Sequence, residues 1–326
     1  MIVVTGATGH IGNVLIRELL AKGERVRAVI PPFEDTTPIE GLEIEKVEGD
    51  VRGVDSLIQA FRGADAVYHL AGIISILPGK TKLLYQVNVM GTRNVVEACL
   101  KSHVRRLIYT SSIHAMAEPP HGTVIDETMP FAPDRAIGEY GKSKAQASLG
   151  ILEGVEKGLD AVLVCPTGVI GPYDFKLSEM GHLFIDFAKG KLNTYVDGAY
   201  DFVDVRDVVR GLTLALEKGG TGESYILSGE RITVAKLMST LEEVTGVKAP
   251  HFKTPMWLAK VMAIFTSPYY SLTNTKPRFT KDSLRILRSN SFISSEKASH
   301  QLGYSHRPIR ETIVDTIQWF EETGRL

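Results

Sequence analysis

Short apolar runs alternate with amphipathic stretches along the first 230 residues. Ile2 to Val4 form an apolar run of the kind that a fully buried parallel strand shows, and further strands are expected at residues 24–30, 42–47, 64–70, 107–109, 161–165 and 223–227. Between them, apolar residues recur at helical spacing, notably over residues 11–19, 54–62, 83–100 and 140–157. Strands that alternate with amphipathic helices predict an α/β fold built on a doubly wound parallel sheet.

Three glycines follow the first apolar run directly. Gly6, Gly9 and Gly12 lie between the predicted strand and the helical pattern that begins at Ile11. Glycine permits a tight turn and a close approach of the backbone to a pyrophosphate, which the N–H groups and dipole of the helix start would hold. A plain turn between a strand and a helix explains the same glycines, so other stretches must decide.

A tyrosine and a lysine lie four residues apart, at Tyr140 and Lys144. This spacing places the phenol and the ammonium on one face of the helix predicted over residues 140–157, within reach of a shared ligand. Such a pair also occurs by chance on many solvated helices, so it is a weak indication by itself. Its meaning depends on the glycine motif that precedes it.

Together these motifs resemble the short-chain dehydrogenase/reductase superfamily, and in particular its extended branch. More matches follow in the family's order, at Gly49–Val51, His69–Gly72, Asn88–Asn94, Thr110–Ser112, Pro166–Pro172 and Phe202–Asp207. The tail, at Arg278–Leu287 and Ser294–Ala298, is similar to that of dihydroflavonol-reductase-like proteins. The resemblance implies a Rossmann-type NAD(P)-binding domain over residues 1–170, completed by about 200–228, and a smaller substrate-binding lobe over 171–199 and 229–326.

The resemblance also implies an NAD(P)-dependent oxidoreductase that transfers a hydride to or from a carbonyl or secondary alcohol. Tyr140 would exchange the proton, Lys144 would stabilise the phenolate and hold the nicotinamide ribose, and Ser112 would bind the substrate oxygen, with Ser111 as the alternative serine. Asn88 would help to hold a water near the lysine. The cofactor-binding residues that it implies are Gly6, Thr8, Gly9, His10, Ile11, Gly12, Asp50, Val51, Leu70, Ala71, Gly72, Tyr140, Lys144, Pro166 and Val169.

Two further functions share this framework. One is a sugar-nucleotide epimerase or dehydratase with tightly bound NAD, and the other is a non-catalytic NAD(P)-sensing regulatory protein. An intact Ser-Tyr-Lys set argues against the regulatory protein, because sensing needs none of the three. The tail and the apolar segment Met256–Phe265 favour the reductase; this segment is expected to pack on the substrate lobe, with a pocket wall or a membrane surface as alternatives. The small-molecule substrate is not identified.

The cofactor is left as NAD or NADP. An acidic residue after the second strand normally accepts from the ribose of NAD, and an arginine accommodates the 2′-phosphate of NADP. Here Ile30 and Pro31 occupy those positions. Glu34 and Asp35 lie just beyond and could serve the ribose, although acidic residues of a solvated loop are the commoner explanation. His69 is expected to be packed and hydrogen-bonded rather than catalytic.

Composition adds several exclusions. Lys plus Arg (37) nearly balance Asp plus Glu (38), so no basic field of the whole chain points to nucleic acid or to an acidic membrane. Cys99 and Cys165 lie in apolar runs and are interpreted as buried thiols in a reducing compartment, and no Cys/His cluster indicates a metal site. A strand that starts at the first residues leaves no room for a signal peptide, and no apolar run is long enough to span a membrane, which together predict a cytoplasmic protein.

A homodimer is expected. Relatives pair two copies through the helices that correspond to residues 83–100 and 140–157. The second of these helices offers more apolar surface than one sheet-facing stripe requires, with Ala145, Ala147, Leu149, Ile151, Leu152 and Val155. Loops of the same chain that cover the extra face are the alternative.

Overall fold

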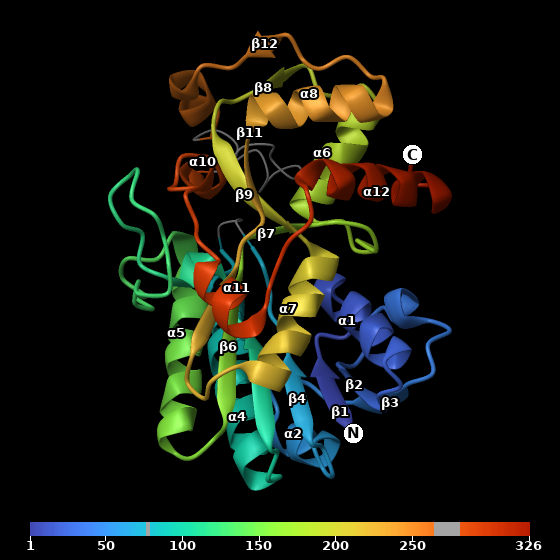
Figure 1. Ribbon diagram of the computed structural model, residues 1–326, viewed down its shortest axis with the longest axis vertical. Coiled ribbons are helices and arrows are strands. Elements are labelled where there is room, and N and C mark those ends of the chain that lie inside the picture. The colour runs from blue at the N-terminus through green and yellow to red at the C-terminus, as the bar shows by residue number, and fades with distance from the viewer. Residues whose placement is uncertain (76–78, 264–280) are drawn as a thin grey trace.

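A parallel sheet forms the centre of the first lobe. The chain's computed structural model describes residues 1–75, 79–263 and 281–326 (Figure 1). Within these residues the sheet has seven strands in the order β10-β6-β5-β4-β1-β2-β3, with every neighbouring pair parallel, which confirms the predicted doubly wound fold. The strands are β1 (Ile2–Thr5), β2 (Val26–Ile30), β3 (Glu45–Glu48), β4 (Ala66–His69), β5 (Arg106–Thr110), β6 (Ala161–Pro166) and β10 (Ser224–Leu227).

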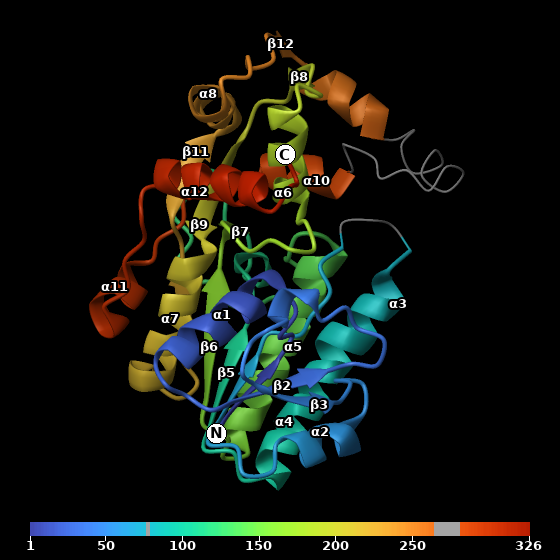
Figure 2. The ribbon, with the colours of Figure 1, turned by 90° about the vertical axis from the view of Figure 1, so that its right-hand side faces the viewer.

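Two layers of helices cover the sheet, one on each face (Figure 2). One layer consists of α1 (His10–Ala21), α7 (Val205–Lys218) and α11 (Glu296–Leu302), and the other of α2 (Val54–Ala60), α4 (Gly91–Lys101) and α5 (Gly138–Glu156). Because both faces are covered, β4 and β6 are buried at every residue, as their continuous apolar runs predict. Cys99 and Cys165 are buried and free within this structure.

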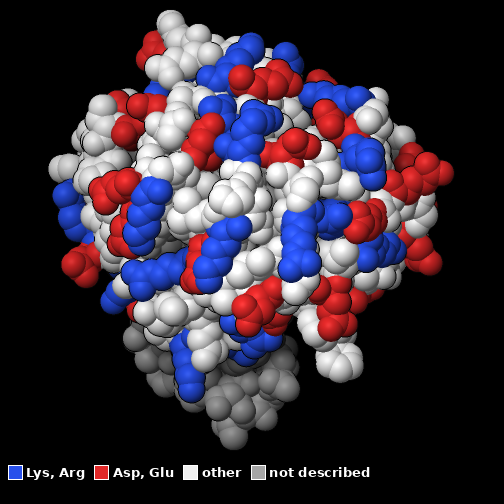
Figure 3. All heavy atoms as spheres, turned by 90° about the horizontal axis from the view of Figure 1, so that it is seen from below, with Lys and Arg blue, Asp and Glu red and all other residues white. Residues whose placement is uncertain are grey.

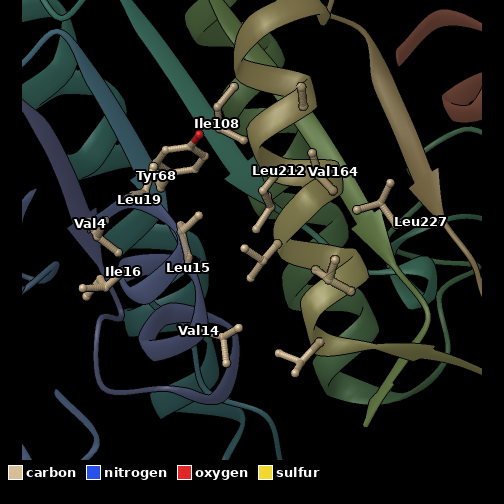
Figure 4. Packing of buried hydrophobic residues seen from close by; sticks show 14 of the residues in the cluster. Val4, Val14, Leu15, Ile16, Leu19, Tyr68, Ile108, Val164, Leu212 and Leu227 are labelled. Carbon is tan, nitrogen blue, oxygen red and sulfur yellow. The ribbon is translucent and has the colours of Figure 1, made fainter. Parts of the chain in front are cut away.

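The core under α1 fixes the position of the glycine loop. Val14, Leu15 and Leu19 of α1 pack toward Tyr68 of the sheet and Leu212 of α7 (Figure 4). Complete burial of a Val or Leu side chain stabilises a fold by about 1.5–3 kcal/mol. Several such side chains therefore hold α1, and the loop that precedes it, firmly against the carboxyl end of β1.

The helix predicted over residues 83–100 is not one regular α-helix. It begins as α3 (Thr81–Leu84), widens into a π-helical segment, η2 (Tyr85–Met90), and continues as α4. Such widened turns are frequent at functional sites. This one contains Asn88, whose buried amide reaches Ser143 of α5.

The chain leaves the first sheet after β6 and builds a second lobe before and after it returns through β10 (Figure 1). In the described residues this lobe has a three-stranded sheet, β11-β9-β7, and a two-stranded one, β12-β8. Its elements are β7 (Gly168–Ile170), α6 (Glu179–Ala188), β8 (Thr194–Tyr195), β9 (Ala199–Asp204), β11 (Glu230–Thr233), α8 (Val234–Thr245), β12 (Phe252–Lys253), α10 (Lys281–Leu287) and α12 (Ile309–Glu322). A separate apolar core holds these elements together.

Two aspartates join α7 to its surroundings. The Asp204 carboxylate accepts from the backbone N–H of Arg206 at 2.7 Å and so caps α7. The Asp207 carboxylate accepts from the backbone N–H of Arg307 at 2.8 Å and from its guanidinium at 2.9 Å. Both carboxylates therefore have structural partners.

The segment predicted as an apolar helix over Met256–Phe265 is helical over residues 256–263, while residues 264 and 265 lie outside the described part. It packs on the second lobe, with Ala259 and Ala263 buried. Of the helices that the structure describes, none combines the length and the apolar character needed to cross a bilayer. On the face seen in Figure 3, acidic and basic side chains are interspersed.

Candidate active site

The loop between β1 and α1 requires glycine at two positions. Gly6 has a φ of 74°, and a Cβ there would stand 2.6 Å from the backbone of Leu70 and Ala71 at the end of β4. A Cβ at Gly12 would lie 2.1 Å from the carbonyl oxygen of Gly6. The loop is thus pressed against the neighbouring strand end, where the strand order reverses on either side of β1.

The first turn of α1 fits a pyrophosphate. The helix begins after Gly9, and within the described chain no side chain caps this turn, which also lacks an acidic residue. Asn13 braces the turn by donating from its amide to the carbonyls of Gly9 and His10 at 2.8 and 3.0 Å. The N–H groups and the positive dipole end of such a turn are suited to hold the phosphates of a dinucleotide.

Three of the predicted cofactor-binding residues in this loop have contacts within the chain. The Thr8 hydroxyl donates to Glu34 Oε1 at 2.7 Å, and His10 Nε2 lies 2.9 Å from the carbonyl oxygen of Pro172. Ile11 is half-buried and packs against the core under α1. The side chains of His10 and Ile11 therefore have structural contacts, so that their predicted contribution to a phosphate site would come from the backbone.

Glu34 connects the glycine loop to the second lobe. Lys176, from the loop between β7 and α6, pairs with the Glu34 carboxylate and donates to the Thr8 hydroxyl at 2.9 Å. Burial acts to raise the pKa of Glu34, but the hydrogen bonds from Lys176 and Thr8 outweigh it and the pKa is lowered. Asp35, by contrast, is exposed and accepts from the N–H and hydroxyl of Thr37 at 3.0 and 2.7 Å. Sequence reasoning missed Lys176, which no local pattern marks.

The next strand ends carry further predicted cofactor residues. Asp50 and Val51 follow β3, and Leu70–Gly72 follow β4. A hydrogen bond from Arg52 lowers the pKa of the Asp50 carboxyl, against the effect of partial burial. Val51 is buried, and its carbonyl accepts from the Asn94 amide at 2.8 Å. These contacts hold the ends of the strands in place at the same edge of the sheet as the glycine loop.

Two predicted cofactor residues lie where the chain passes between the lobes. Pro166 ends β6, and Val169 lies half-buried in β7 against the core of the first lobe. A Cβ at Gly168, between them, would stand 2.7 Å from the ring of Phe202. The passage is therefore tightly packed, and it places Val169 near the junction of the lobes.

His69 has a structural role, as the sequence predicted. Its ring is fully buried, with Nδ1 2.8 Å from the Thr5 hydroxyl and Nε2 3.0 Å from the Thr92 hydroxyl. Burial lowers the pKa of His69 to about 3, so the ring is neutral at physiological pH. A neutral ring whose two nitrogens are engaged packs the end of β4 against α4.

Tyr140 and Lys144 lie one turn apart on α5. Lys144 Nζ donates to the Thr110 carbonyl at 2.6 Å and lies 4.5 Å from the centre of the Tyr109 ring. Burial lowers the pKa of Lys144 to about 7. Burial also raises the pKa of Tyr140 to about 12, although hydrogen bonding to Ser112 acts in the opposite direction. Both shifts favour the uncharged forms of the two side chains.

The two adjacent serines after β5 face different partners. Ser111 Oγ lies 2.7 Å from Ser148 Oγ on α5, and both side chains are buried. Ser112 Oγ accepts from the backbone N–H of His114 at 3.2 Å and lies beside the Tyr140 phenol. Of these two serines, Ser112, the one predicted to bind the substrate oxygen, therefore lies next to the phenol, whereas Ser111 is bonded to α5.

Asn88 is hydrogen-bonded at both ends of its amide. Oδ1 accepts from the N–H of Ile73 at 2.8 Å, while Nδ2 donates to the Ile73 carbonyl at 3.0 Å and to Ser143 Oγ at 2.9 Å. A Cβ at Gly72 would stand 3.3 Å from Asn88 Oδ1 and 3.9 Å from Lys144 Nζ, so the three groups meet at one point. Asn88 fixes the chain after β4 next to the lysine, whereas its role in holding a water stays a prediction. Sequence reasoning missed Ser143, although it lies between Tyr140 and Lys144.

A cavity of about 70 Å³ lies between the lobes, just beyond Ser112, and its lining includes Ile113, His114, Tyr200 and Asp201. It adjoins a larger cleft of about 1230 Å³ in the second lobe, because both are lined by Glu118, Ala199, Ser289 and Ser291. Burial raises the pKa of Asp201 and lowers that of His114 to about 4. The cleft of the second lobe therefore continues into a cavity whose lining includes the two residues that follow Ser112, Ile113 and His114.

Comparison with known proteins agrees with this arrangement. Residues 2–228 match the model of the NAD dependent epimerase/dehydratase family. The chain is 36% identical to the sterol demethylase protein B of Methylococcus capsulatus over 99% of both chains. It is 31% identical to a putative dihydroflavonol 4-reductase of Synechocystis over 98% of this chain and 94% of the relative. The crystal structure of gox2253 superposes with a TM-score of 0.88 at 35% identity, over 100% of this chain and 99% of that one.

The family match ends just after β10, the strand that completes the first sheet, while the two relatives and the solved structure extend over the second lobe as well. The glycine loop, the sheet order and the helix that carries Tyr140 all lie within the matched residues. The chain belongs to the NAD-dependent epimerase/dehydratase family of extended short-chain dehydrogenases/reductases and is a nicotinamide-dependent enzyme of the oxidoreductase type.

Proposed function

We propose that this enzyme transfers a hydride to or from a carbonyl or secondary alcohol of a small molecule, using Ser112, Tyr140 and Lys144. The observation that carries the proposal is the convergence of these side chains at the carboxyl end of β5, beside the cavity between the lobes. The dinucleotide, when bound, supplies or accepts the hydride. The chain supplies the proton and fixes the substrate oxygen.

Tyr140 is the proton donor and acceptor of this proposal. A phenol with a pKa of about 12 is protonated at neutral pH, which suits it to donate to a carbonyl oxygen that gains negative charge. In the reverse direction the phenolate must form, and a nearby cation stabilises it. Lys144 has a pKa of about 7, so its amine can take up a proton near neutral pH. Its positive charge then offsets the negative charge of the phenolate. The Thr110 carbonyl holds the amine in place.

Ser112 orients the substrate in this proposal. Its hydroxyl accepts from the N–H of His114 and is adjacent to Tyr140, so its own proton is available to a substrate oxygen. The cofactor would lie across the carboxyl ends of the strands, from α1 to α5. There the uncapped start of α1 would hold the phosphates, and Glu34 would accept from the hydroxyls of the adenosine ribose.

Free carbonyl or alcohol substrates are supported by the relatives, which include a sterol demethylase protein B and a putative dihydroflavonol 4-reductase.

One observation favours the epimerase or dehydratase alternative. Among the described residues that line the large cleft, the cations outnumber the anions Glu118 and Asp197, with Arg231, Lys260, Arg285 and Arg288. A basic cleft is suited to the diphosphate of a sugar nucleotide.

A single experiment separates these functions. Purified protein is incubated with NAD, NADP or their reduced forms and a panel of ketones, sterols and UDP- or dTDP-sugars. A reductase changes the amount of reduced cofactor in step with the product, whereas an epimerase or dehydratase converts its substrate with no net change in the cofactor. Cofactor binding without conversion of any substrate, under conditions where a related reductase is active, would count against both.

A further inference from the structure

One helix of the second lobe is apolar on two opposite faces. The helix over residues 256–263 turns Met256, Ala259 and Ala263 toward the core of the second lobe. The opposite face points away from the protein, and its residues are between one third and two thirds exposed: Leu258 37%, Val261 43%, Met262 45% and Trp257 67%. At 3.6 residues per turn, the two sets lie on opposite sides of the helix axis.

Phe252 extends this exposed surface from the neighbouring strand β12, where it is 78% exposed. Figure 2 shows β12 and the helix, in orange, together at the end of the second lobe that lies farthest from the first. Phe252, Trp257, Leu258, Val261 and Met262 are called the apolar rim below. Single exposed apolar residues are common, but a group of this size at one place marks a binding surface.

The chain around the apolar rim is basic. Residues 248–263 contain Lys248, Lys253 and Lys260 and no Asp or Glu. All three lysines are exposed, and Lys253 also pairs with Asp197. Tryptophan prefers the headgroup level of a bilayer, and lysine reaches past apolar neighbours to the phosphates. An amphipathic helix with both kinds of residue is typical of segments that lie in the plane of a membrane interface.

The same helix forms part of the wall of the large cleft. Met256, Lys260 and Ala263 line the cleft from the inner side of the helix, and Arg285 and Arg288 line it from α10. A helix that lies in the interface would therefore hold this wall of the cleft against the bilayer. Molecules dissolved in the outer part of the bilayer would then be next to this cleft, which adjoins the smaller cavity between the lobes.

We propose that the protein docks through the apolar rim on the surface of an anionic lipid bilayer. Lys248 and Lys253, which flank the rim, then meet lipid phosphates of opposite charge, which adds to the burial of the apolar side chains. A second copy of the chain fits this surface less well, because a two-fold contact through the rim would bring the lysines of both copies together. The proposal concerns a surface and holds whichever reaction the active site performs.

The chain carries its own probe for this docking. It has two tryptophans, of which Trp257 is exposed in the rim and Trp319 is buried. The full-length protein is mixed with vesicles of phosphatidylcholine containing about one third phosphatidylglycerol, and with vesicles of phosphatidylcholine alone. We expect sedimentation with the anionic vesicles, a blue shift of the tryptophan emission, and weaker binding at high salt. Binding to the neutral vesicles should be at least about tenfold weaker.

The double variant Trp257→Ser/Val261→Ser should bind the anionic vesicles at least about tenfold more weakly. The matched control is Val124→Ser, which removes an apolar residue that is 51% exposed outside the rim and should leave vesicle binding unchanged. Retained NAD binding shows that each variant is folded. The proposal is overturned if the unmodified protein stays in the supernatant with both vesicle types, or if the double variant still sediments like the unmodified protein. It is equally overturned if the unmodified protein is a dimer that the double variant converts to a monomer, because the rim would then cover a second copy.

Discussion

Glu34 and Lys176 form an ion pair above the glycine loop, with the Thr8 hydroxyl bonded to both. The glutamate follows β2 in the first lobe, and the lysine follows β7 in the second, so the pair joins the two lobes where the adenosine end of a dinucleotide would lie. A carboxylate at this point would accept from ribose hydroxyls and would repel a 2′-phosphate.

We therefore expect the enzyme to bind NAD more tightly than NADP, and Glu34→Gln to reduce this preference by at least about tenfold. The substitution removes the repulsion and frees Lys176 to pair with the phosphate. Calorimetric dissociation constants for both cofactors measure the change. Asp35→Asn is the matched control, because that exposed carboxylate bonds to Thr37 instead of Thr8. Equal effects of the two substitutions would show that the ion pair does not select the cofactor.

The two serines after β5 provide a matched pair of substitutions. Ser112→Ala should lower kcat by about tenfold to a hundredfold, because the substrate oxygen loses a hydrogen bond that positions it for proton transfer. Ser111→Ala should instead lower the free energy of unfolding by about 1 kcal/mol, through loss of the bond to Ser148, with little change in kcat. Steady-state kinetics and urea unfolding of both variants give the comparison. The reverse pattern would assign the catalytic role to Ser111.

Tyr140→Phe should lower kcat by at least about a hundredfold, the usual scale for loss of a general acid–base group. The dissociation constant for NAD should change little, since the aromatic ring is kept. Lys144→Met should lower kcat to a similar degree and should also weaken cofactor binding, because the amine is expected to hold the ribose. A Phe variant with nearly normal turnover would exclude Tyr140 as the proton donor.

Stability should depend on pH through Lys144. Burial lowers the pKa of its amine from 10.5 to about 7, so between these values the unfolded chain binds a proton that the folded protein does not. By linkage, this group makes the folded state more stable as the pH rises from about 7 toward 10.5, by up to about 1.4 kcal/mol per pH unit. Urea unfolding of the cofactor-free protein at about pH 7 and about pH 9.5 should show the rise, and Lys144→Met should abolish it. Parallel curves would mean that Lys144 remains charged when buried.

The homodimer remains a prediction. The structure excludes several residues of α5 from the surface that would form the dimer interface. Ala145, Ala147 and Ile151, which were counted as surplus apolar surface of α5, are completely buried, and Ala147 and Ile151 pack against the chain's own sheet. That part of the argument was wrong, because α5 is packed both on the sheet and beside α4. Leu149 is 37% exposed, and Met90 in η2 is 38% exposed.

Leu149→Glu should therefore halve the mass in solution while the protein stays folded, because the change places a charge in the predicted dimer interface. Ile151→Glu should only unfold the protein, since that side chain is buried within one chain. Light scattering together with circular dichroism distinguishes the two effects. An unmodified protein that is monomeric at about micromolar concentration would rule out the dimer.

Local patterns located most of the first lobe, because strands buried on both faces appear as continuous apolar runs. The exception shows the limit of this signal. The strand expected over residues 42–47 is observed at Glu45–Glu48, an exposed edge strand, while Leu42 and Ile44 pack against the core under α1. An apolar run that packs against a neighbouring helix has the same sequence pattern as a buried strand. Only the three-dimensional packing distinguishes the two.

The candidate site could be predicted as far as its parts lie in contiguous motifs. Gly6 and Gly12 could be identified from the spacing of the glycines. The turn leaves no room for a side chain at either position, so both must be glycine. Lys176 could not be found in this way, since its partner Glu34 lies in the other lobe, and a lysine in a polar loop has no distinguishing pattern. The widening of the helix at Asn88 was missed for a similar reason, because a π-helical turn and an α-helix differ little in apolar spacing.

The position of β10 has a consequence for how the protein is made. β10 pairs with β6, but residues 167–223, which include much of the second lobe, are synthesised between them. Until β10 emerges from the ribosome, β6 is an open sheet edge, although all six of its residues are buried in the finished protein. Open apolar edges pair with other chains, which leads to aggregation. The length of the inserted segment therefore sets how long the open edge of each nascent chain is exposed to aggregation. Chaperones would be needed most during that interval.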